Sequence, residues 1–190
     1  MKCLVHILNC TVGEDLALDQ LARRVEAEFR CIASIDAGAL DFSGAFDESR
    51  GQHQSTIFLA QLMERHISTH EKIIAIVNVD LYIPVLTFVF GEAQFNGSVA
   101  VASTHRLAEQ RYGLPANDAL MRQRLHKEVV HELGHTFGLY HCRQFECVMR
   151  SSTSVEEIDG KAVHLCGHCI NNIQEQSKTV TEVLSKGNNL

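Results

Sequence analysis

The amino-acid sequence predicts an α/β fold, a mixed sheet with helices and an antiparallel edge strand, followed by a small C-terminal subdomain. Three observations support this prediction. Strand-like and helix-like hydrophobic patterns alternate through the first half of the chain, a histidine-rich motif lies on a helical pattern, and four of the seven cysteines lie between positions 142 and 169. With 190 residues, of which 45% are hydrophobic, the chain can form one domain with a continuous core.

The first third of the chain predicts a strand, a helix, a loop and a second helix. The apolar run Lys2–Leu8 is typical of a buried strand, and Glu14–Arg30 carries apolar residues at helical spacing. Residues 36–54 are rich in Gly, Asp and Ser, which indicates a loop. Apolar residues recur at helical spacing over residues 57–67. This alternation of strand and helix is typical of an α/β sheet.

The middle of the chain predicts three strands and a long helix. Residues 73–79, 86–90 and 98–102 are dominated by β-branched, aromatic and other apolar residues. A turn containing Gly and Asn separates the last two segments, so we expect them to pair in antiparallel fashion. A helix is expected over about 117–137, because Asn117 can cap its start and apolar residues recur at every fourth position.

Composition and charge exclude several classes of protein. The formal net charge is −6 and no basic block is present, so nucleic acid is not an expected partner. The N-terminus lacks the long apolar run of a secretory signal. The nearly uncharged residues 73–91 contain Asp80 and Pro84, which do not suit a membrane span. We therefore expect a cytoplasmic protein that does not associate with membranes, and a monomer is slightly favoured.

The stretch HELGHTFGLYHC, which begins at His131, carries the strongest chemical signal. On a helix, His131 and His135 lie on one face about one turn apart, which suits two ligands of one zinc ion. Gly138 can end the helix in the left-handed conformation, and the turn lets His141 return as a third ligand. Three neutral ligands leave an open position, as in catalytic zinc sites. Glu132 is then placed to act as general base on the bound water.

Four cysteines predict a second, structural zinc site. Cys142 and Cys147 form a C-x4-C pair and Cys166 and Cys169 a C-x2-C pair, which together can surround a tetrahedral ion with no open position. Two disulfides or reduced buried thiols are the alternatives. Because neighbouring residues project in different directions, His141 can face one ion while Cys142 faces the other. We therefore expect two Zn²⁺ ions per chain.

The whole motif resembles that of the archaemetzincin family of metzincin zinc peptidases. The string HExxHxxGxxH is followed by C-x4-C-x-M and a downstream C-x2-C. The matching residues are His131, Glu132, His135, Gly138, His141, Cys142, Cys147, Met149, Cys166 and Cys169. The blocks FDESRGQ, FVFGEAQ and VAVAST are also similar to family sequence, so the resemblance covers nearly the whole chain.

The resemblance implies a metzincin-like domain over residues 1–190, with a cleft between two subdomains. An upper subdomain would span residues 1–138 and include the active-site helix, and a lower subdomain would span 139–190 with the four-cysteine zinc site. A substrate peptide would lie antiparallel to an upper-rim strand from the 98–102 region. Met149 would be the methionine beneath the metal, although its composition alone suits an ordinary core residue equally well.

Two functions follow from the sequence. The first is a zinc metallopeptidase that hydrolyses peptide bonds in a peptide or protein substrate, with Glu132 as the catalytic base. The alternative is a zinc-stabilised peptide- or protein-binding module with little or no turnover. Tyr140 and Tyr112 are candidates to stabilise a tetrahedral intermediate, and the spacing favours neither.

Overall fold

The computed structural model describes residues 3–65 and 67–175 of the chain. The strands are β1 (Leu4–Asn9), β2 (Ile32–Ala37), β3 (Phe46–Asp47), β4 (Gln52–Gln54), β5 (Glu71–Val77), β6 (Leu81–Tyr82), β7 (Gly91–Ala93) and β8 (Val99–Ser103). The helices are α1 (Leu18–Phe29), α2 (Ser55–Met63), α3 (Asp118–Thr136), α4 (Val155–Asp159) and the 3₁₀ helix η1 (Glu109–Tyr112). A mixed sheet has the order β2-β1-β5-β8-β7, and a smaller one the order β3-β4-β6. The α/β fold with an antiparallel edge is confirmed.

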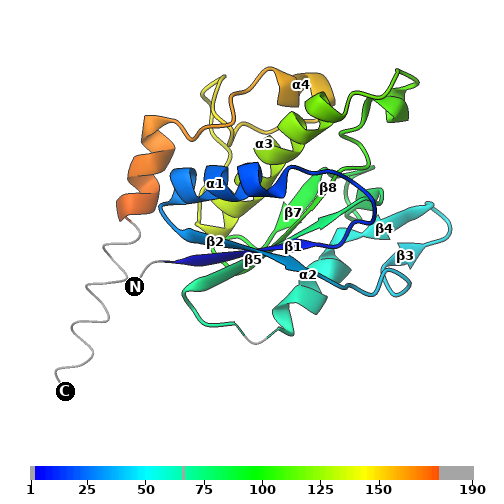
Figure 1. Ribbon diagram of the computed structural model, residues 1–190, viewed down its shortest axis with the longest axis horizontal. Helices are drawn as coiled ribbons and strands as arrows, with labels where there is room; N and C mark the ends of the chain where they lie inside the picture. The colour runs from blue at the N-terminus through cyan, green and yellow to red at the C-terminus, as the bar shows by residue number, and fades with distance from the viewer. Residues whose placement is uncertain (1–2, 66, 176–190) are drawn as a thin grey trace.

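Helices cover both faces of the larger sheet. Helices α1 and α3 lie on one face and α2 lies on the other (Figure 1). Side chains alternate between these faces along each strand, so Val5 and Ile7 of β1 pack in the core with α1 and α3, whereas Leu8 packs in the core with α2. Each such buried side chain contributes about 1.5 to 3 kcal/mol of hydrophobic stabilisation. The core on the face of α1 and α3 holds α3 against the sheet, and the other core holds α2.

The long helix predicted over 117–137 is confirmed as α3. The Asn117 side chain accepts a hydrogen bond from the Leu120 N–H at 3.1 Å, which caps the first turn. The helix ends at Thr136, and Gly138 takes a φ of +79°, the left-handed conformation that glycine adopts without strain. The histidine motif therefore starts on a helix and leaves it at a sharp turn.

The predicted loop over residues 36–54 was wrong at both ends. Its first two residues belong to β2, which pairs in parallel with β1 along its whole length. Its last three form β4, which pairs with β3 and β6. β2 is an outer strand whose side chains are mostly exposed, so it has no hydrophobic alternation to mark it. Its backbone pairing with β1 defines it instead.

The predicted antiparallel pair has a different first strand. Residues 91–93 form β7 and pair with β8, whereas residues 86–90 precede the strand. β8 is close to its predicted position, but it lies inside the sheet between β5 and β7. The prediction that the 98–102 region supplies the upper-rim strand is therefore wrong, because β7 and not β8 is the outer strand on that side.

The chain beyond Gly138 returns across the face that carries α1 and α3. The polar composition of residues 151–160 predicts a loop, but α4 forms within this segment. The spacing of Ile170, Ile173, Val180 and Leu184 predicts a last helix. Residues 167–175 are helical, and the rest of this predicted helix lies outside the described residues. Apolar residues on both sides of Gly138 share one core, so the subdomain boundary at 138 stays a prediction. No helix in the described part of the chain is both long and apolar enough to cross a membrane.

Candidate metal centres

Three histidines converge at the end of α3. His131 and His135 are one turn apart on the helix, and His141 follows the turn at Gly138. One ring nitrogen from each lies within 4.8 Å of those of the other two. The spacing in the sequence therefore brings together the three residues that it predicted.

The hydrogen bonds of two of these rings determine which nitrogen is free. His131 Nδ1 lies 2.8 Å from the Val148 carbonyl oxygen, and His135 Nδ1 lies 2.7 Å from the Leu139 carbonyl oxygen. A carbonyl only accepts, so both Nδ1 atoms carry the proton and both Nε2 atoms carry lone pairs in the neutral rings. These Nε2 atoms are 3.2 Å apart. Two lone pairs this close fit ligands of one cation, because nitrogen ligands around tetrahedral zinc are about 3.3 Å apart.

Burial keeps these rings in the form that binds metal. It lowers the pKa of His131 well below the ordinary value and also lowers the pKa of His135 and His141. The positive charge of Lys161 lowers all three further. The neutral imidazole therefore persists at neutral pH.

Glu132 lies between the first two histidines in the sequence and is 6% exposed. Burial raises its pKa well above the ordinary value, the Glu128 carboxylate adds to this effect and Lys161 opposes it. A Cβ on Gly91 of β7 would lie 2.7 Å from Glu132 Cγ and 2.8 Å from its Oε1. The carboxylate therefore lies directly against the edge strand of the sheet.

The four motif cysteines form a second cluster. One Sγ atom from each of Cys142, Cys147, Cys166 and Cys169 lies within 4.8 Å of the others. The Sγ atoms of Cys142 and Cys166 are 3.8 Å apart, as are those of Cys147 and Cys169. A disulfide bond needs about 2.05 Å, whereas thiolates around tetrahedral zinc are about 3.8 Å apart. The four sulfur atoms are therefore spaced as ligands of one zinc ion and are too far apart for the two disulfide bonds of the alternative.

The two histidines near the second cysteine pair are engaged elsewhere. His164 Nδ1 contacts Glu28 Oε1 at 2.6 Å, and His168 Nε2 lies 3.3 Å from Asn172 Nδ2. Neither belongs to the cysteine cluster.

The three histidines open into a cleft with a volume of about 560 Å³. One wall consists of residues 86–93, which include β7, and the other elements are α3 and the segment after Met149. The lining residues from α3 and beyond are Glu128, His131, Glu132, His135, His141, Ser151, Ser152 and Thr153. Neither tyrosine proposed from the sequence lines this cleft. Tyr112 OH donates to the Arg106 carbonyl, and Tyr140 is 76% exposed.

Sequence reasoning missed four residues around the cleft. They are Gly91, Glu92, Glu128 and Lys161. Glu128 precedes His131 by three positions, so helical spacing alone places it on the same face of α3. Gly91, Glu92 and Lys161 come from distant segments, and no local pattern connects them to the motif.

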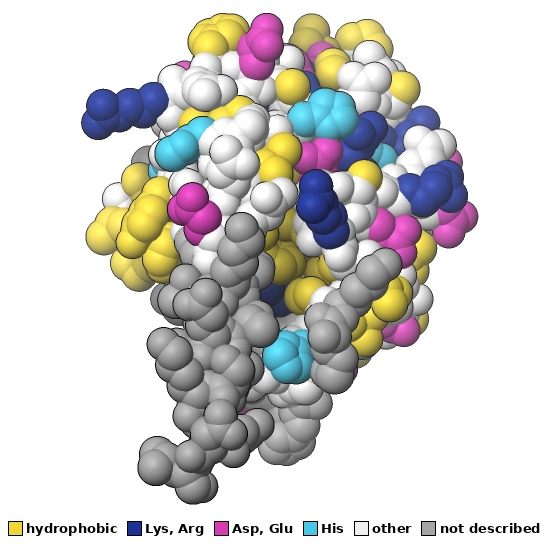
Figure 2. Space-filling view, turned by 90° about the vertical axis from the view of Figure 1, so that its left-hand side faces the viewer, with side chains coloured by type: hydrophobic (Ala, Val, Ile, Leu, Met, Phe, Trp, Pro, Cys, Tyr) yellow, Lys and Arg dark blue, Asp and Glu magenta, His cyan; other side chains and the backbone are white. Residues whose placement is uncertain are grey.

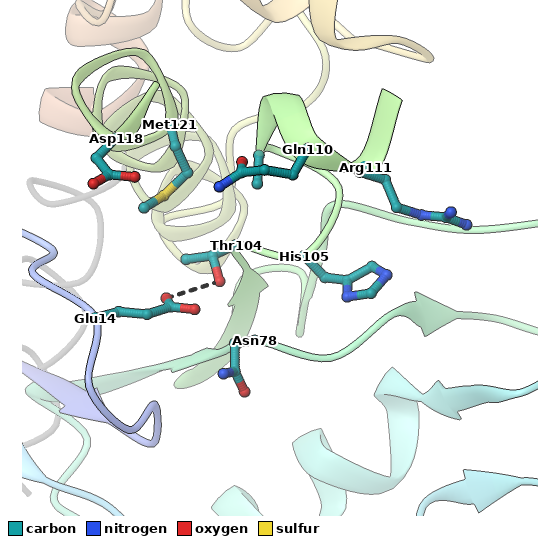
Figure 3. Close-up of a pocket in the computed structure, with 9 residues that line it drawn as sticks. Glu14, Asn78, Thr104, His105, Gln110, Arg111, Asp118 and Met121 are labelled. Atoms are coloured by element: carbon teal, nitrogen blue, oxygen red, sulfur yellow. Dashed lines mark hydrogen bonds between the residues drawn. The ribbon is translucent and has the colours of Figure 1, made fainter. Parts of the chain in front are cut away.

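A second cavity, with a volume of about 450 Å³, lies at the carboxyl ends of β1, β5 and β8 (Figure 3). Ligands often bind at this edge of a parallel sheet. The Glu14 carboxylate, however, already accepts a hydrogen bond from Thr104 Oγ1 at 3.0 Å. The side chains of His105 and Arg111 point away from this carboxylate (Figure 3). No group of metal ligands in the described residues lies here, so the candidate site is the histidine cleft.

Comparison with known proteins gives the class of protein that the sequence motif resembles, the archaemetzincin peptidases. The sequence model of Peptidase family M54 matches residues 41–175. The chain is 46% identical over 157 residues to the archaemetzincin of Haloquadratum walsbyi, covering 79% of this chain and 90% of that protein. It is 40% identical over 176 residues to the archaemetzincin of Haloarcula marismortui, covering 89% and 99%.

Solved structures agree with these sequence matches. The archaemetzincin of Methanopyrus kandleri superposes with a TM-score of 0.82 at 29% identity, covering 93% of this chain and 96% of that one. The malonate complex of the archaemetzincin of Archaeoglobus fulgidus gives a TM-score of 0.73 at 32% identity, covering 89% and 99%. The chain has an α/β fold with a histidine cleft beside its edge strand. Together with these relatives, this makes it a zinc metallopeptidase. The chain belongs to Peptidase family M54, whose curated relatives here are archaemetzincins.

Proposed function

We propose that the chain hydrolyses peptide bonds with a zinc ion held by His131, His135 and His141 and with Glu132 as general base. The observation that carries this proposal is the pair of Nε2 lone pairs 3.2 Å apart, beside a buried carboxylate in an open cleft. Zinc bound to three neutral ligands lowers the pKa of a water molecule and polarises a carbonyl group.

Glu132 then performs the proton transfers. Its carboxylate faces the cleft beside β7, where it can accept a proton from the attacking water. The same group afterwards gives that proton to the nitrogen of the leaving amine. The raised pKa strengthens this carboxylate as a base, which favours the first of these two steps.

The substrate backbone is proposed to extend the sheet at β7. Phe90 accepts from the Ser103 N–H, and the Gln94 N–H donates to Val99, so these two residues face β8. Hydrogen-bonded and non-hydrogen-bonded positions alternate along an antiparallel pair, so Glu92 also faces β8. The backbone N–H and C=O groups of Gly91 and Ala93 therefore point away from β8. An extended peptide can hydrogen bond to them by strand addition.

The cysteine cluster is proposed to hold a second, structural zinc ion. Cys142 follows His141 directly, so the two ions would stabilise one continuous turn of the chain. The Cys142 N–H also donates to the Met149 carbonyl at 2.9 Å, which ties this turn to the segment beneath the histidines. We propose that residues 139–190 act as the lower subdomain around this ion.

Expected partners other than peptides stay predictions. On the face shown in Figure 2, Lys and Arg side chains stand among acidic and uncharged ones and form no continuous basic patch. A cytoplasmic location and a monomeric state also remain predictions.

The Glu132→Gln substitution tests the proposed mechanism. It keeps the size and hydrogen bonding of the side chain but removes the base, so zinc should stay bound while hydrolysis of a peptide library falls by at least about a hundredfold. Zinc content and cleavage products, measured by metal analysis and mass spectrometry, check this. Glu48→Gln, at an exposed glutamate between β3 and β4, is the matched control and should change neither. Loss of zinc from the Glu132 variant would show that this residue holds the site together instead.

A further inference from the structure

A buried ion pair at the wall of the cleft has no part in the proposed proton transfer. Lys161 Nζ lies 3.1 Å from Glu128 Oε1, and the two side chains are only 1% and 4% exposed. Lys161 also donates to the Arg150 carbonyl at 3.2 Å. Burying such a pair costs desolvation energy that its attraction often only balances, so stability alone is a weak reason for its presence.

The same wall presents two acceptors that can take further hydrogen bonds. Although Lys161 is close enough to Glu128 for an ion pair, no hydrogen bond of proper geometry reaches Glu128 Oε1 within the described residues. The buried Ser152 Oγ is likewise without a hydrogen-bond partner there. Both residues line the cleft. The lining includes the carboxylates of Glu92, Glu128 and Glu132 but neither Lys nor Arg among the described residues. This wall is therefore suited to a ligand that donates hydrogen bonds.

The orientation of β7 shows which part of a substrate meets this wall. Gly91, at the start of β7, lies against Glu132, and the Asn96 N–H just beyond its end donates to the His135 carbonyl. β7 and α3 therefore run in the same direction past the site. Glu128, one turn before His131, lies toward the start of β7. A peptide antiparallel to β7 places the residues after its scissile bond at this end.

We propose that Glu128 selects the residue that follows the scissile bond, and that the preferred residue carries a basic side chain, arginine or lysine. This inference rests on the proposed function and names its substrate class. The aliphatic stem of the side chain enters the cleft, and its charged tip donates to Glu128 Oε1 and Ser152 Oγ. An apolar side chain of similar size leaves Ser152 Oγ unpaired and Glu128 with Lys161 as its only partner, which disfavours it.

The test compares blocked hexapeptides, acetyl-Ala-Ala-Ala-Xaa-Ala-Ala-amide, in which Xaa is arginine or leucine. Binding is measured to the zinc-loaded Glu132→Gln variant by calorimetry, and cleavage before Xaa by the zinc-loaded wild type is measured by mass spectrometry. We expect the arginine peptide to be favoured at least about tenfold in both, the scale of one charge-assisted hydrogen bond. Adding Glu128→Leu should abolish or reverse this preference.

A second variant guards against misfolding. Glu128→Leu alone leaves Lys161 buried without its partner, so the double variant Glu128→Leu, Lys161→Met replaces the whole pair by apolar side chains. It should fold and favour the leucine peptide. The control is Glu109→Gln, which disturbs the 2.6 Å ion pair between Glu109 of η1 and Arg124 of α3, outside the cleft. It should leave the arginine preference intact.

The outcomes separate the two proposals. A wild type that favours leucine, or a folded double variant that still favours arginine, would overturn the role of Glu128. Cleavage without any preference would do the same and leave hydrolysis supported. Binding that favours arginine with no cleavage by the wild type would instead refute the proposed hydrolysis and leave the selectivity supported.

Discussion

At the residue scale, Gly91 determines how closely the sheet edge approaches Glu132. A Cβ there would meet the Val101 carbonyl oxygen at 2.6 Å and Glu132 Cγ at 2.7 Å, closer than such contacts occur. Gly91→Ala should therefore displace the carboxylate or the strand, with a destabilisation of about 1 to 3 kcal/mol. We expect hydrolysis to fall while the zinc content is unchanged, as checked by metal analysis and denaturant unfolding. Wild-type stability and activity in this variant would show that β7 moves aside without effect.

Asp80 is a second single residue with a measurable effect. Burial acts to raise its pKa, but the Arg106 guanidinium, with Nη2 2.7 Å from Oδ2, more than reverses this and holds the pKa below the usual value. The pair therefore stabilises the fold fully above the unfolded pKa of about 3.9, and this stabilisation is lost as the pH falls further. Asp80→Asn should cost about 1 to 3 kcal/mol at pH 7, with a smaller difference at pH 3, in urea unfolding. A difference independent of pH would contradict the ion-pair account.

At the element scale, the segment after α3 depends on its cysteines. It contributes α4 and the helix of residues 167–175, and its sulfur atoms lie at zinc-ligand spacing. Cys166→Ser, Cys169→Ser should lower the melting temperature and loosen the histidine site, because Cys142 adjoins His141 and transmits disorder to it. Calorimetry and metal analysis check this. Cys31→Ala, at a buried cysteine outside the cluster, is the control and should keep the full metal content.

At the scale of the whole molecule, we expect two zinc ions per chain with different lability. A chelator should remove the histidine-bound ion first, since its fourth position is open to the cleft. Acid should also release that ion, but only below the ordinary histidine pKa of about 6.5, because burial lowers the pKa of His131 and the neutral ring persists. Zinc content measured against pH and chelator checks both expectations. A stoichiometry near one would contradict the second site.

Local patterns in the sequence were enough to predict much of this molecule. The interval between His131 and His135 equals one helical turn, and the cap at Asn117 and the glycine at 138 mark where that helix starts and turns. The group of three histidines follows from such spacing along one helix and the turn after it, whereas the two cysteine pairs come from separate segments that the fold brings together. The core strands β5 and β8 were predicted from their continuous apolar runs, which are typical of strands buried on both faces.

Only the tertiary structure decided the surroundings of the site. β2 carries no hydrophobic alternation, and its position follows from pairing with β1. Gly91 reaches Glu132 because β7 is the outer strand, and Lys161 reaches Glu128 because the chain returns over α3. These contacts join segments that are distant in the sequence, so they depend on how whole elements pack rather than on the period of any one of them. The sequence by itself therefore determined the candidate ligands and the candidate base, and the packing decided which edge and which charges face the cleft.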